Sequence, residues 1–327
     1  MASQSTADAL ALVSQGQTAR GVALLEAAAR AGDVDALMQL AVWRIAGRPL
    51  PRDLDAARIY LRQAVAIGHV DGALMEVALT ANGNGNASAA DWPTALALLD
   101  TAAAGDPVAA QQRALVAAMR LLADGTPDRP PEGQALAAEP RVIHYPRFLT
   151  ADECGHVASV GNDLLEPARI VDPRTGRAVP HPIRSSDNGL IGPAREDLVI
   201  RAINLRIAAA TRTDVTQGEP LTVLRYRSGQ QYRPHLDTIE GATNQRVRTF
   251  IIYLNEGFGG GETTFPLLPL TVRPRGGDAI MFDTVLPEGS PDPRARHAGN
   301  PVTAGAKWIA TRWIRAQPVD SWTVHTA

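Results

Sequence analysis

Residues 226–237 read YRSGQQYRPHLD, and this stretch holds two side chains that can bind a metal ion. On a β-strand, residues i and i+2 point to the same face, so the imidazole of His235 and the carboxylate of Asp237 can converge on one ion. A second histidine, His297, follows 60 residues after Asp237. Two histidines and one carboxylate form the facial triad of non-haem Fe(II) sites, which leaves coordination positions open. The alternative is a hydrogen-bonded His–Asp pair without a metal.

Lys307 is the one lysine among 32 basic residues, and it lies ten residues after His297. An ammonium is a compact point charge on a long stem, whereas a guanidinium is a planar fork. A chain that otherwise uses arginine can therefore place this lysine in a narrow anion site. The alternative is an ordinary surface lysine.

The chain from about residue 139 onward has the pattern of a strand-rich domain. Thr150 followed by Glu153 predicts a helix start with a capping box, and residues 196–210 predict an amphipathic helix. Short β-rich runs broken by Gly, Pro and Asn then follow at residues 221–227, 248–254, 261–265, 270–272, 279–282 and 307–314. Strands at this spacing predict a sandwich or jelly-roll barrel.

Residues 7–122 are rich in alanine and leucine and contain an internal repeat. Turn glycines at positions 32, 68 and 105 give periods of 36 and 37 residues. Each glycine is expected to supply a left-handed helix C-cap, and a following Asp can cap the next helix. Paired helices of this period stack into a solenoid, and the pattern resembles Sel1-like repeats, relatives of the tetratricopeptide repeat.

The expected organisation is α+β and multidomain. Residues 1–122 form the helical repeats, 123–138 a linker rich in Pro and Gly, 139–318 the strand-rich domain and 319–327 a tail. The formal net charge of −2 favours neither nucleic acid nor an anionic membrane as a partner. The single cysteine, Cys154, excludes an intramolecular disulfide and a cysteine-based zinc site. With no signal peptide and no apolar run of about 20 residues, we expect a cytoplasmic location.

Further short blocks accompany YRSGQQYRPHLD: RVRTFIIYLN (246–255), GGETTFP (260–266), PRGGDA (274–279), HAGNPV (297–302) and GAKW (305–308). Upstream, FLTADEC (148–154) and IRSS (183–186) precede it. Over about residues 140–315, these blocks resemble the prolyl 4-hydroxylase family of Fe(II)- and 2-oxoglutarate-dependent dioxygenases. The resemblance implies a double-stranded β-helix (jelly roll) with flanking helices as the catalytic domain.

The resemblance also implies roles for individual residues. It makes His235, Asp237 and His297 the Fe(II) ligands. It pairs Lys307 with the distal C5 carboxylate of 2-oxoglutarate, because a buried carboxylate needs a paired cation and further hydrogen bonds.

Three further residues are assigned to the cosubstrate pocket. Thr249 is the candidate for an additional hydrogen bond to the distal carboxylate. Tyr226 and Tyr232 are expected to line the pocket, with Tyr226 nearer the cosubstrate, and packing in an aromatic core is the alternative for both. Trp308 and Trp313 are interpreted as core residues.

The implied reaction consumes O2 and 2-oxoglutarate, releases succinate and CO2, and hydroxylates an unactivated C–H, with ascorbate as a further possible cofactor. A peptidyl proline is the expected substrate, and the helical repeats can bind the peptide or only stabilise the chain. The long loop around residues 170–190 is expected to be a substrate-covering lid or an ordinary connection. The alternatives are the same chemistry on another residue or a free small molecule, and an inactive repeat-based adaptor.

Overall fold

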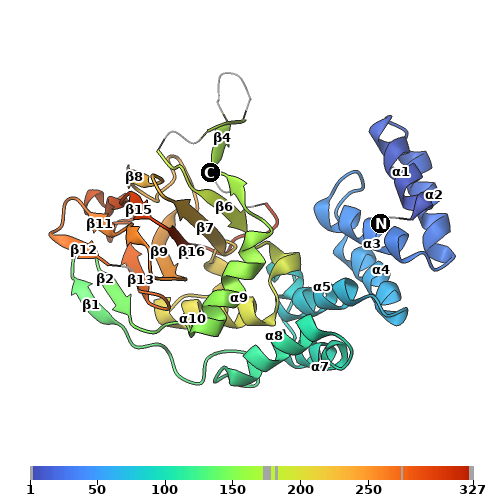
Figure 1. Ribbon diagram of the computed structural model, residues 1–327, viewed down its shortest axis with the longest axis horizontal. Coiled ribbons are helices and arrows are strands. Elements are labelled where there is room, and N and C mark those ends of the chain that lie inside the picture. Colours follow the sequence, from blue (N-terminus) through green and yellow to red (C-terminus); the bar gives the residue numbers. More distant parts are fainter. Residues whose placement is uncertain (1–2, 172–177, 181–182, 274, 324–327) are drawn as a thin grey trace. The chain divides into compact units, whose positions relative to one another are not determined.

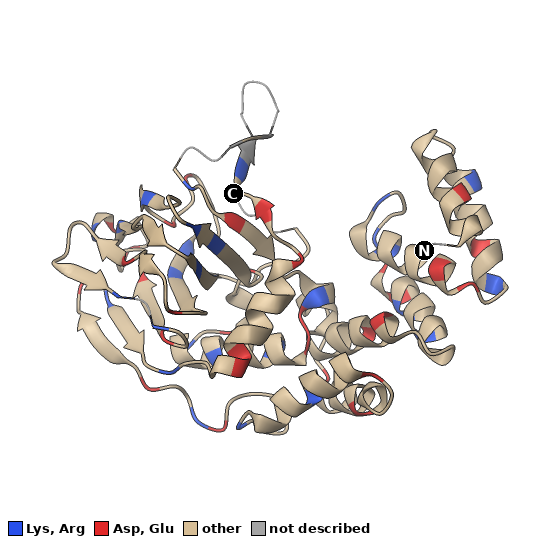
Figure 2. Cartoon of the chain, in the orientation of Figure 1, with Lys and Arg blue, Asp and Glu red and all other residues tan. Residues whose placement is uncertain are grey.

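The computed structural model describes residues 3–171, 178–180, 183–273 and 275–323. The chain divides into two compact units, Met1–Ala117 with Ala194–Leu198, and Ala118–Pro193 with Val199–Ala327. Acidic and basic residues are interspersed along both units (Figure 2). Among the described residues, none of the helices combines the length and apolar character that a membrane-spanning segment needs.

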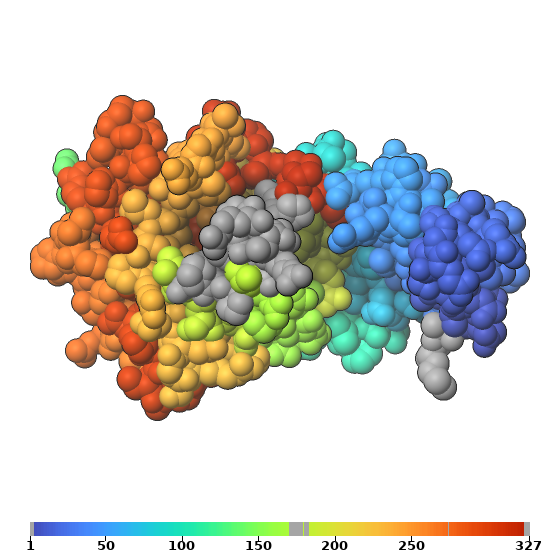
Figure 3. All heavy atoms as spheres, turned by 90° about the horizontal axis from the view of Figure 1, so that it is seen from above, coloured from blue at the N-terminus to red at the C-terminus, as the bar shows by residue number. Residues whose placement is uncertain are grey.

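The first unit is helical, as its alanine- and leucine-rich sequence predicts. Its helices are α1 (Gln4–Ser14), α2 (Thr18–Arg30), α3 (Val34–Ala46), α4 (Leu54–Ala66), α5 (Val70–Ala81), α6 (Gly83–Asn86), α7 (Trp92–Ala103) and α8 (Pro107–Ala118). Successive helices from α1 to α5 pack against one another, and α5 packs against α7. The blue-to-cyan colours of this unit accordingly run in chain order in the space-filling view (Figure 3).

The predicted left-handed glycine is present at two of the three turns, and the predicted aspartate cap is also present at two of the three. Gly32 and Gly68 have left-handed φ values of 84° and 86°. At the first turn, the Asp33 side chain accepts a hydrogen bond from the α3 backbone, and at the second His69 takes this capping position. The expectation for Gly105 was wrong, because its φ is not positive, and Ala104, the C-cap of α7, has a right-handed conformation. Asp106 nevertheless caps α8 as predicted, since its Oδ1 accepts a hydrogen bond of 2.8 Å from the Ala109 amide.

The second unit is built from antiparallel sheets (Figure 1). Its strands are β1 (Gln134–Ala137), β2 (Val142–Tyr145), β3 (Glu166–Pro167), β4 (Arg169–Val171), β5 (Ala178–Pro180), β6 (Asp187–Leu190), β7 (Thr222–Arg227), β8 (Tyr232–His235), β9 (Arg246–Tyr253), β10 (Gly259–Gly260), β11 (Thr263–Phe265), β12 (Leu270–Val272), β13 (Ala279–Asp283), β14 (His297–Gly299), β15 (Val302–Ala304) and β16 (Ala306–Arg315). A large sheet has the order β1-β2-β13-β9-β16-β7-β6-β3, and a smaller one has the order β12-β11-β14-β8. This arrangement fits the predicted jelly roll. Strand β1 lies within the segment expected to be a linker.

The core of this unit contains side chains from both sheets. Tyr253 and Phe282 come from the large sheet and Phe265 from the smaller one, and each is at most 1% exposed. The rings of Phe265 and Phe282 meet edge to face at 5.2 Å. The sheets are therefore held together by aromatic packing, and the strands that carry the candidate metal ligands sit on this core.

Two helices support the large sheet. Helix α9 (Ala151–Asn162) begins with the predicted capping box, in which Thr150 and Glu153 exchange hydrogen bonds. It packs against β7, and its Gly161 is required there, because a Cβ at this position would lie 2.5 Å from Val223. Helix α10 (Leu198–Thr211) starts two residues later than predicted.

Candidate active site

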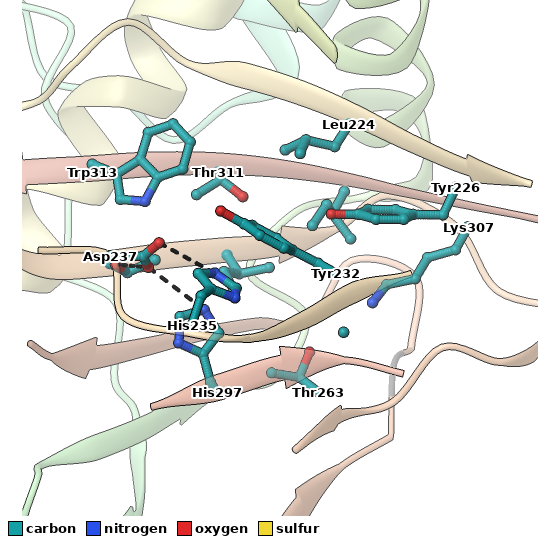
Figure 4. Close-up of a pocket in the computed structure, with 14 residues that line it drawn as sticks. Leu224, Tyr226, Tyr232, His235, Asp237, Thr263, His297, Lys307, Thr311 and Trp313 are labelled. Atoms are coloured by element: carbon teal, nitrogen blue, oxygen red, sulfur yellow. Dashed lines mark hydrogen bonds and ion pairs between the residues drawn. The ribbon is translucent and has the colours of Figure 1, made fainter. Parts of the chain in front are cut away.

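Two neighbouring strands of the smaller sheet bring the two histidines together. His235 on β8 and His297 on β14 are paired across the antiparallel ladder. Strand β8 ends at His235, so Asp237 lies beyond the strand on which we expected it. Its carboxylate nevertheless turns toward both imidazoles (Figure 4), with Oδ1 3.5 Å from Nε2 of His235 and Oδ2 3.6 Å from Nε2 of His297.

Hydrogen bonds to the backbone orient both imidazoles for metal binding. Nδ1 of His235 lies 2.8 Å from the Arg233 carbonyl oxygen, and Nδ1 of His297 lies 3.1 Å from the Ala295 carbonyl oxygen. A carbonyl can only accept, so each Nδ1 carries the proton and each Nε2 presents a lone pair. Nε2 of His235 is buried and has no hydrogen-bond partner among the described residues. The donor atoms of the triad lie within 4.8 Å of one another, which fits one divalent ion.

The protonation states of this cluster also suit a metal. Burial, together with the neighbouring His235, lowers the pKa of His297 to about 4, so its imidazole is neutral at pH 7. Burial opposes ionisation of Asp237, but the two histidines and a hydrogen bond from Thr249 hold its pKa well below the usual range. The cluster therefore offers a neutral imidazole at His297 and an ionised carboxylate at Asp237 beside the imidazole of His235, and two histidines with one carboxylate are the donor set of non-haem Fe(II) sites.

Thr249 lies against the metal cluster. It was expected to bind the distal carboxylate of 2-oxoglutarate, but its Oγ1 donates a hydrogen bond of 2.6 Å to Oδ2 of Asp237. Thr249 is fully buried on β9. This bond engages Oδ2 and leaves Oδ1 as the carboxylate oxygen available to an ion.

Lys307 is buried, with 3% of its surface exposed, which excludes an ordinary surface lysine. Its Nζ donates a hydrogen bond of 2.7 Å to the Gly261 carbonyl, and the rings of Tyr226 and Tyr253 lie 5.7 and 5.6 Å from Nζ. Burial lowers the pKa of Lys307 to about 8, and Glu262 opposes this shift. Among the ion pairs between described residues, none neutralises this ammonium within 4 Å, so it can receive an anionic ligand.

One strand forms a wall of the pocket between these groups. Alternate residues of β16, Lys307, Ile309, Thr311 and Trp313, all line it. Trp313 is 4% exposed, and its Nε1 is a buried donor without a partner in the described part of the chain. The interpretation of Trp313 as a core residue therefore missed its place in the pocket. The period of two along β16 from Lys307 was the signal that could have found it.

The two tyrosines predicted for the pocket both line it. The Tyr232 ring stacks on the His235 imidazole, with centroids 3.4 Å apart and planes at 15°. Tyr226 is 2% exposed, and burial raises its pKa to about 12, so it stays a neutral phenol. Thr263 also lines the pocket and was not predicted. Its hydroxyl oxygen accepts a hydrogen bond of 2.8 Å from the Tyr253 hydroxyl.

Comparison with known proteins places this site in a family. The model of the 2OG-Fe(II) oxygenase superfamily matches residues 221–315. The probable prolyl 4-hydroxylase 10 of Arabidopsis thaliana is 33% identical over an alignment of 206 residues, and the match covers 56% of this chain and 71% of that protein. The chain belongs to the prolyl 4-hydroxylase family. As a member it is a 2-oxoglutarate-dependent dioxygenase, and the cofactors of the family are Fe(II), 2-oxoglutarate and O2.

Other prolyl 4-hydroxylases show similar degrees of likeness. The probable prolyl 4-hydroxylase 3 of Arabidopsis thaliana is 34% identical over 205 residues, covering 55% of this chain and 71% of that protein. A crystal structure of the viral collagen prolyl hydroxylase of Paramecium Bursaria Chlorella virus-1 is 28% identical. It covers 54% of this chain and 96% of its own, with a TM-score of 0.44.

Proposed function

We propose that this prolyl 4-hydroxylase family member hydroxylates a proline in a peptide. The observation that carries the proposal is the order of groups along the pocket. A buried ammonium, a His-Asp-His cluster and an indole N–H that has no partner among the described residues line one cavity (Figure 4). These groups suit a dicarboxylate cosubstrate, a metal and a substrate with a hydrogen-bond acceptor.

His235, Asp237 and His297 hold the iron in this proposal. Their fit rests on the orphaned Nε2 of His235 and on the two Nδ1 contacts to backbone carbonyls. Iron and 2-oxoglutarate bound there supply the oxidising chemistry, with O2 consumed and succinate and CO2 released. Three protein donors on one face leave positions for the cosubstrate and O2.

Lys307 binds the distal carboxylate of 2-oxoglutarate. Its buried ammonium attracts an anion more strongly than an exposed one would, because little water screens the charge. Tyr226 packs beside Nζ and excludes water from the same end of the pocket. Thr249 acts on Asp237, as its hydrogen bond indicates, and Tyr232 supports the ring of His235.

Trp313 marks the substrate end of the pocket. An indole N–H buried without a partner is unfavourable by about 1–3 kcal/mol, so a bound acceptor would gain from meeting it. A peptide carbonyl is such an acceptor. The similarity to the two probable prolyl 4-hydroxylases of Arabidopsis supports proline as the residue that is modified.

The helical unit is proposed to bind the protein substrate through Sel1-like repeats. Its paired helices and the left-handed glycines at positions 32 and 68 support that repeat type. We retain the division into repeats at 1–122, a linker at 123–138, the dioxygenase domain at 139–318 and a tail at 319–327. Residues 324–327 of the tail lie outside the described residues, as do 172–177 and 181–182 of the expected lid. The cytoplasmic location, the use of ascorbate and the lack of nucleic-acid and membrane partners stay predictions.

The deciding experiment is incubation of the full chain with Fe(II), 2-oxoglutarate and proline-containing peptides. Succinate release and a mass gain of one oxygen on proline are expected. Turnover with free amino acids or with another residue, and none with proline, would replace the substrate assignment. Absence of iron and cosubstrate binding would leave the adaptor alternative. His235→Ala should abolish turnover that depends on the metal.

Removal of residues 1–125 tests the role assigned to the repeats. Peptide affinity should fall, whereas succinate formation in the absence of peptide should remain. An unchanged peptide affinity would restrict the repeats to a structural role.

A further inference from the structure

Asn255 binds both peptide groups that flank Lys307. The ladder between β9 and β16 ends near Tyr253, which pairs with Ile309. Beyond it, Nδ2 of Asn255 donates a hydrogen bond of 2.8 Å to the Ala306 carbonyl. The Trp308 amide donates one of 2.8 Å to Oδ1 of the same side chain. The amide of Asn255 thus takes the place of a strand backbone beside Lys307, near the start of β16.

The same loop contacts the other end of the Lys307 side chain. Residues 255–261, which we call the lysine clip, end at Gly261, whose carbonyl accepts the hydrogen bond from Nζ. Gly261 has a φ of 72°, and a Cβ there would lie 3.1 Å from Cδ of Lys307. The clip therefore holds the lysine by its backbone through Asn255 and by its ammonium through Gly261.

A side chain with four flexible carbons needs such fixation to present its charge at one place. Holding a lysine in one rotamer costs side-chain entropy, and a clip formed before the ligand arrives reduces the entropy cost that binding must still cover. Nζ also lies close to the strand of the third candidate metal ligand, because a Cβ on Gly299 would be 4.0 Å from it. The position of Nζ relative to this strand sets the length of dicarboxylate that spans the pocket.

We propose that Asn255 is a positioning residue that fixes the Lys307 ammonium and thereby selects a five-carbon 2-oxo dicarboxylate. The proposal rests on the role assigned to Lys307 under the proposed function. An amide is required because it donates and accepts at once. An aspartate has the same shape and can still accept from Trp308, but it places a charged oxygen against the Ala306 carbonyl.

The test is equilibrium binding of 2-oxoglutarate to the full chain loaded with Mn(II), measured by calorimetry without O2. Asn255→Asp should weaken binding roughly five- to a hundredfold, as expected when one buried hydrogen bond is lost. The ratio of the affinity for 2-oxoglutarate to the affinities for the longer 2-oxoadipate and the shorter oxaloacetate should also become smaller. The affinity for Mn(II) should stay the same. Gly261→Ala should displace the end of the Lys307 side chain near its ammonium, and it should lower the same affinity ratio.

Asn244→Asp is the matched control. The Asn244 amide also donates to backbone carbonyls and accepts from a backbone amide, at Gln317 and Pro318. It should leave binding of all three dicarboxylates unchanged. Wild-type affinity and preference in both Asn255→Asp and Gly261→Ala would overturn the proposal. Wild-type binding in Lys307→Ala would instead overturn the role of Lys307 itself.

Discussion

Thr249 and Asp237 link the large sheet directly to the candidate metal cluster described above. The Thr249 hydroxyl donates a hydrogen bond of 2.6 Å to Oδ2 of Asp237, and the pair lies in the buried interior. The threonine fixes the rotamer of the carboxylate, so that Oδ1 faces His235 and Oδ2 faces His297. A partner of a metal ligand is expected to matter almost as much as the ligand itself.

Thr249→Val should therefore weaken metal binding roughly 10- to 100-fold, because valine keeps the shape and removes the donor. Thr249→Ser should restore most of the affinity. Competition between the protein and a chromogenic chelator for Co(II) measures both variants, and the Co(II) absorption spectrum reports the geometry. Equal affinity and spectra for the valine variant and the wild type would contradict this role.

Binding of 2-oxoglutarate should weaken as the pH rises through about 8. The pKa of Lys307 is lowered to about 8 by burial, so the ammonium is charged below that pH and is increasingly neutral above it. The cosubstrate carboxylates are ionised throughout this range, so only the lysine titrates. Dissociation constants at pH 7 and pH 9.5 should differ by roughly tenfold or more for the wild type.

Lys307→Arg provides the matched comparison. The arginine stays charged throughout this range, so its affinity should be lower at pH 7 but flat between the two pH values. A flat profile in the wild type would show that Lys307 does not carry the charge that the cosubstrate meets.

Glu219 is predicted to be a major contributor to the stability of the strand-rich unit. It is 1% exposed and accepts hydrogen bonds from Arg246 and Arg315, which are paired across β9 and β16. Glu219→Gln leaves two guanidinium groups side by side and should lower the free energy of unfolding by about 3–5 kcal/mol. Glu139→Gln, in an exposed pair with Arg294, should change it by less than about 1 kcal/mol. Urea unfolding followed by tryptophan fluorescence measures the free energy of unfolding of both variants. Similar losses of stability in the two variants would disprove the prediction.

His69 caps the N-terminus of α5, and it stabilises this helix less than the aspartate caps stabilise other helices of the unit. Its Nδ1 accepts a hydrogen bond of 3.1 Å from the Gly72 amide at the start of α5, where Asp33 serves α3. His69→Asp should raise the stability of this unit by about 0.5–1 kcal/mol, since aspartate is a preferred cap that also favours the helix dipole. His69→Ala should lower it. Thermal melting of the helical signal gives both values, and an unchanged midpoint in the aspartate variant would refute the cap.

The sequence was sufficient to predict which residues meet at the metal cluster. The spacing of His235 and Asp237 and the block around His297 carry the family pattern, and the comparisons confirm that family. The capping box at Thr150 was likewise predictable, since it depends on residues three apart.

Contacts that depend on tertiary structure could not be predicted in this way. The partner of Thr249 depends on how β9 lies beside the turn after β8, which no local pattern specifies. The end of β8 at His235 and the lack of a left-handed φ at Gly105 were also not predictable from otherwise typical local sequences. Asn255 closes the family block at residues 246–255, but its contacts with the backbone around Lys307 appear only when β16 is placed next to it.

Strand β16 joins the two ends of the pocket by a single stretch of backbone. Lys307 and Trp313 are six residues apart and face the same side, so their separation is fixed by the rise of a β-strand at about 20 Å. An insertion or deletion of one residue between them would turn one of the two away from the cavity. This segment can therefore diversify by exchanging side chains but not by changing length, and adaptation to a larger substrate must come from the loops around it.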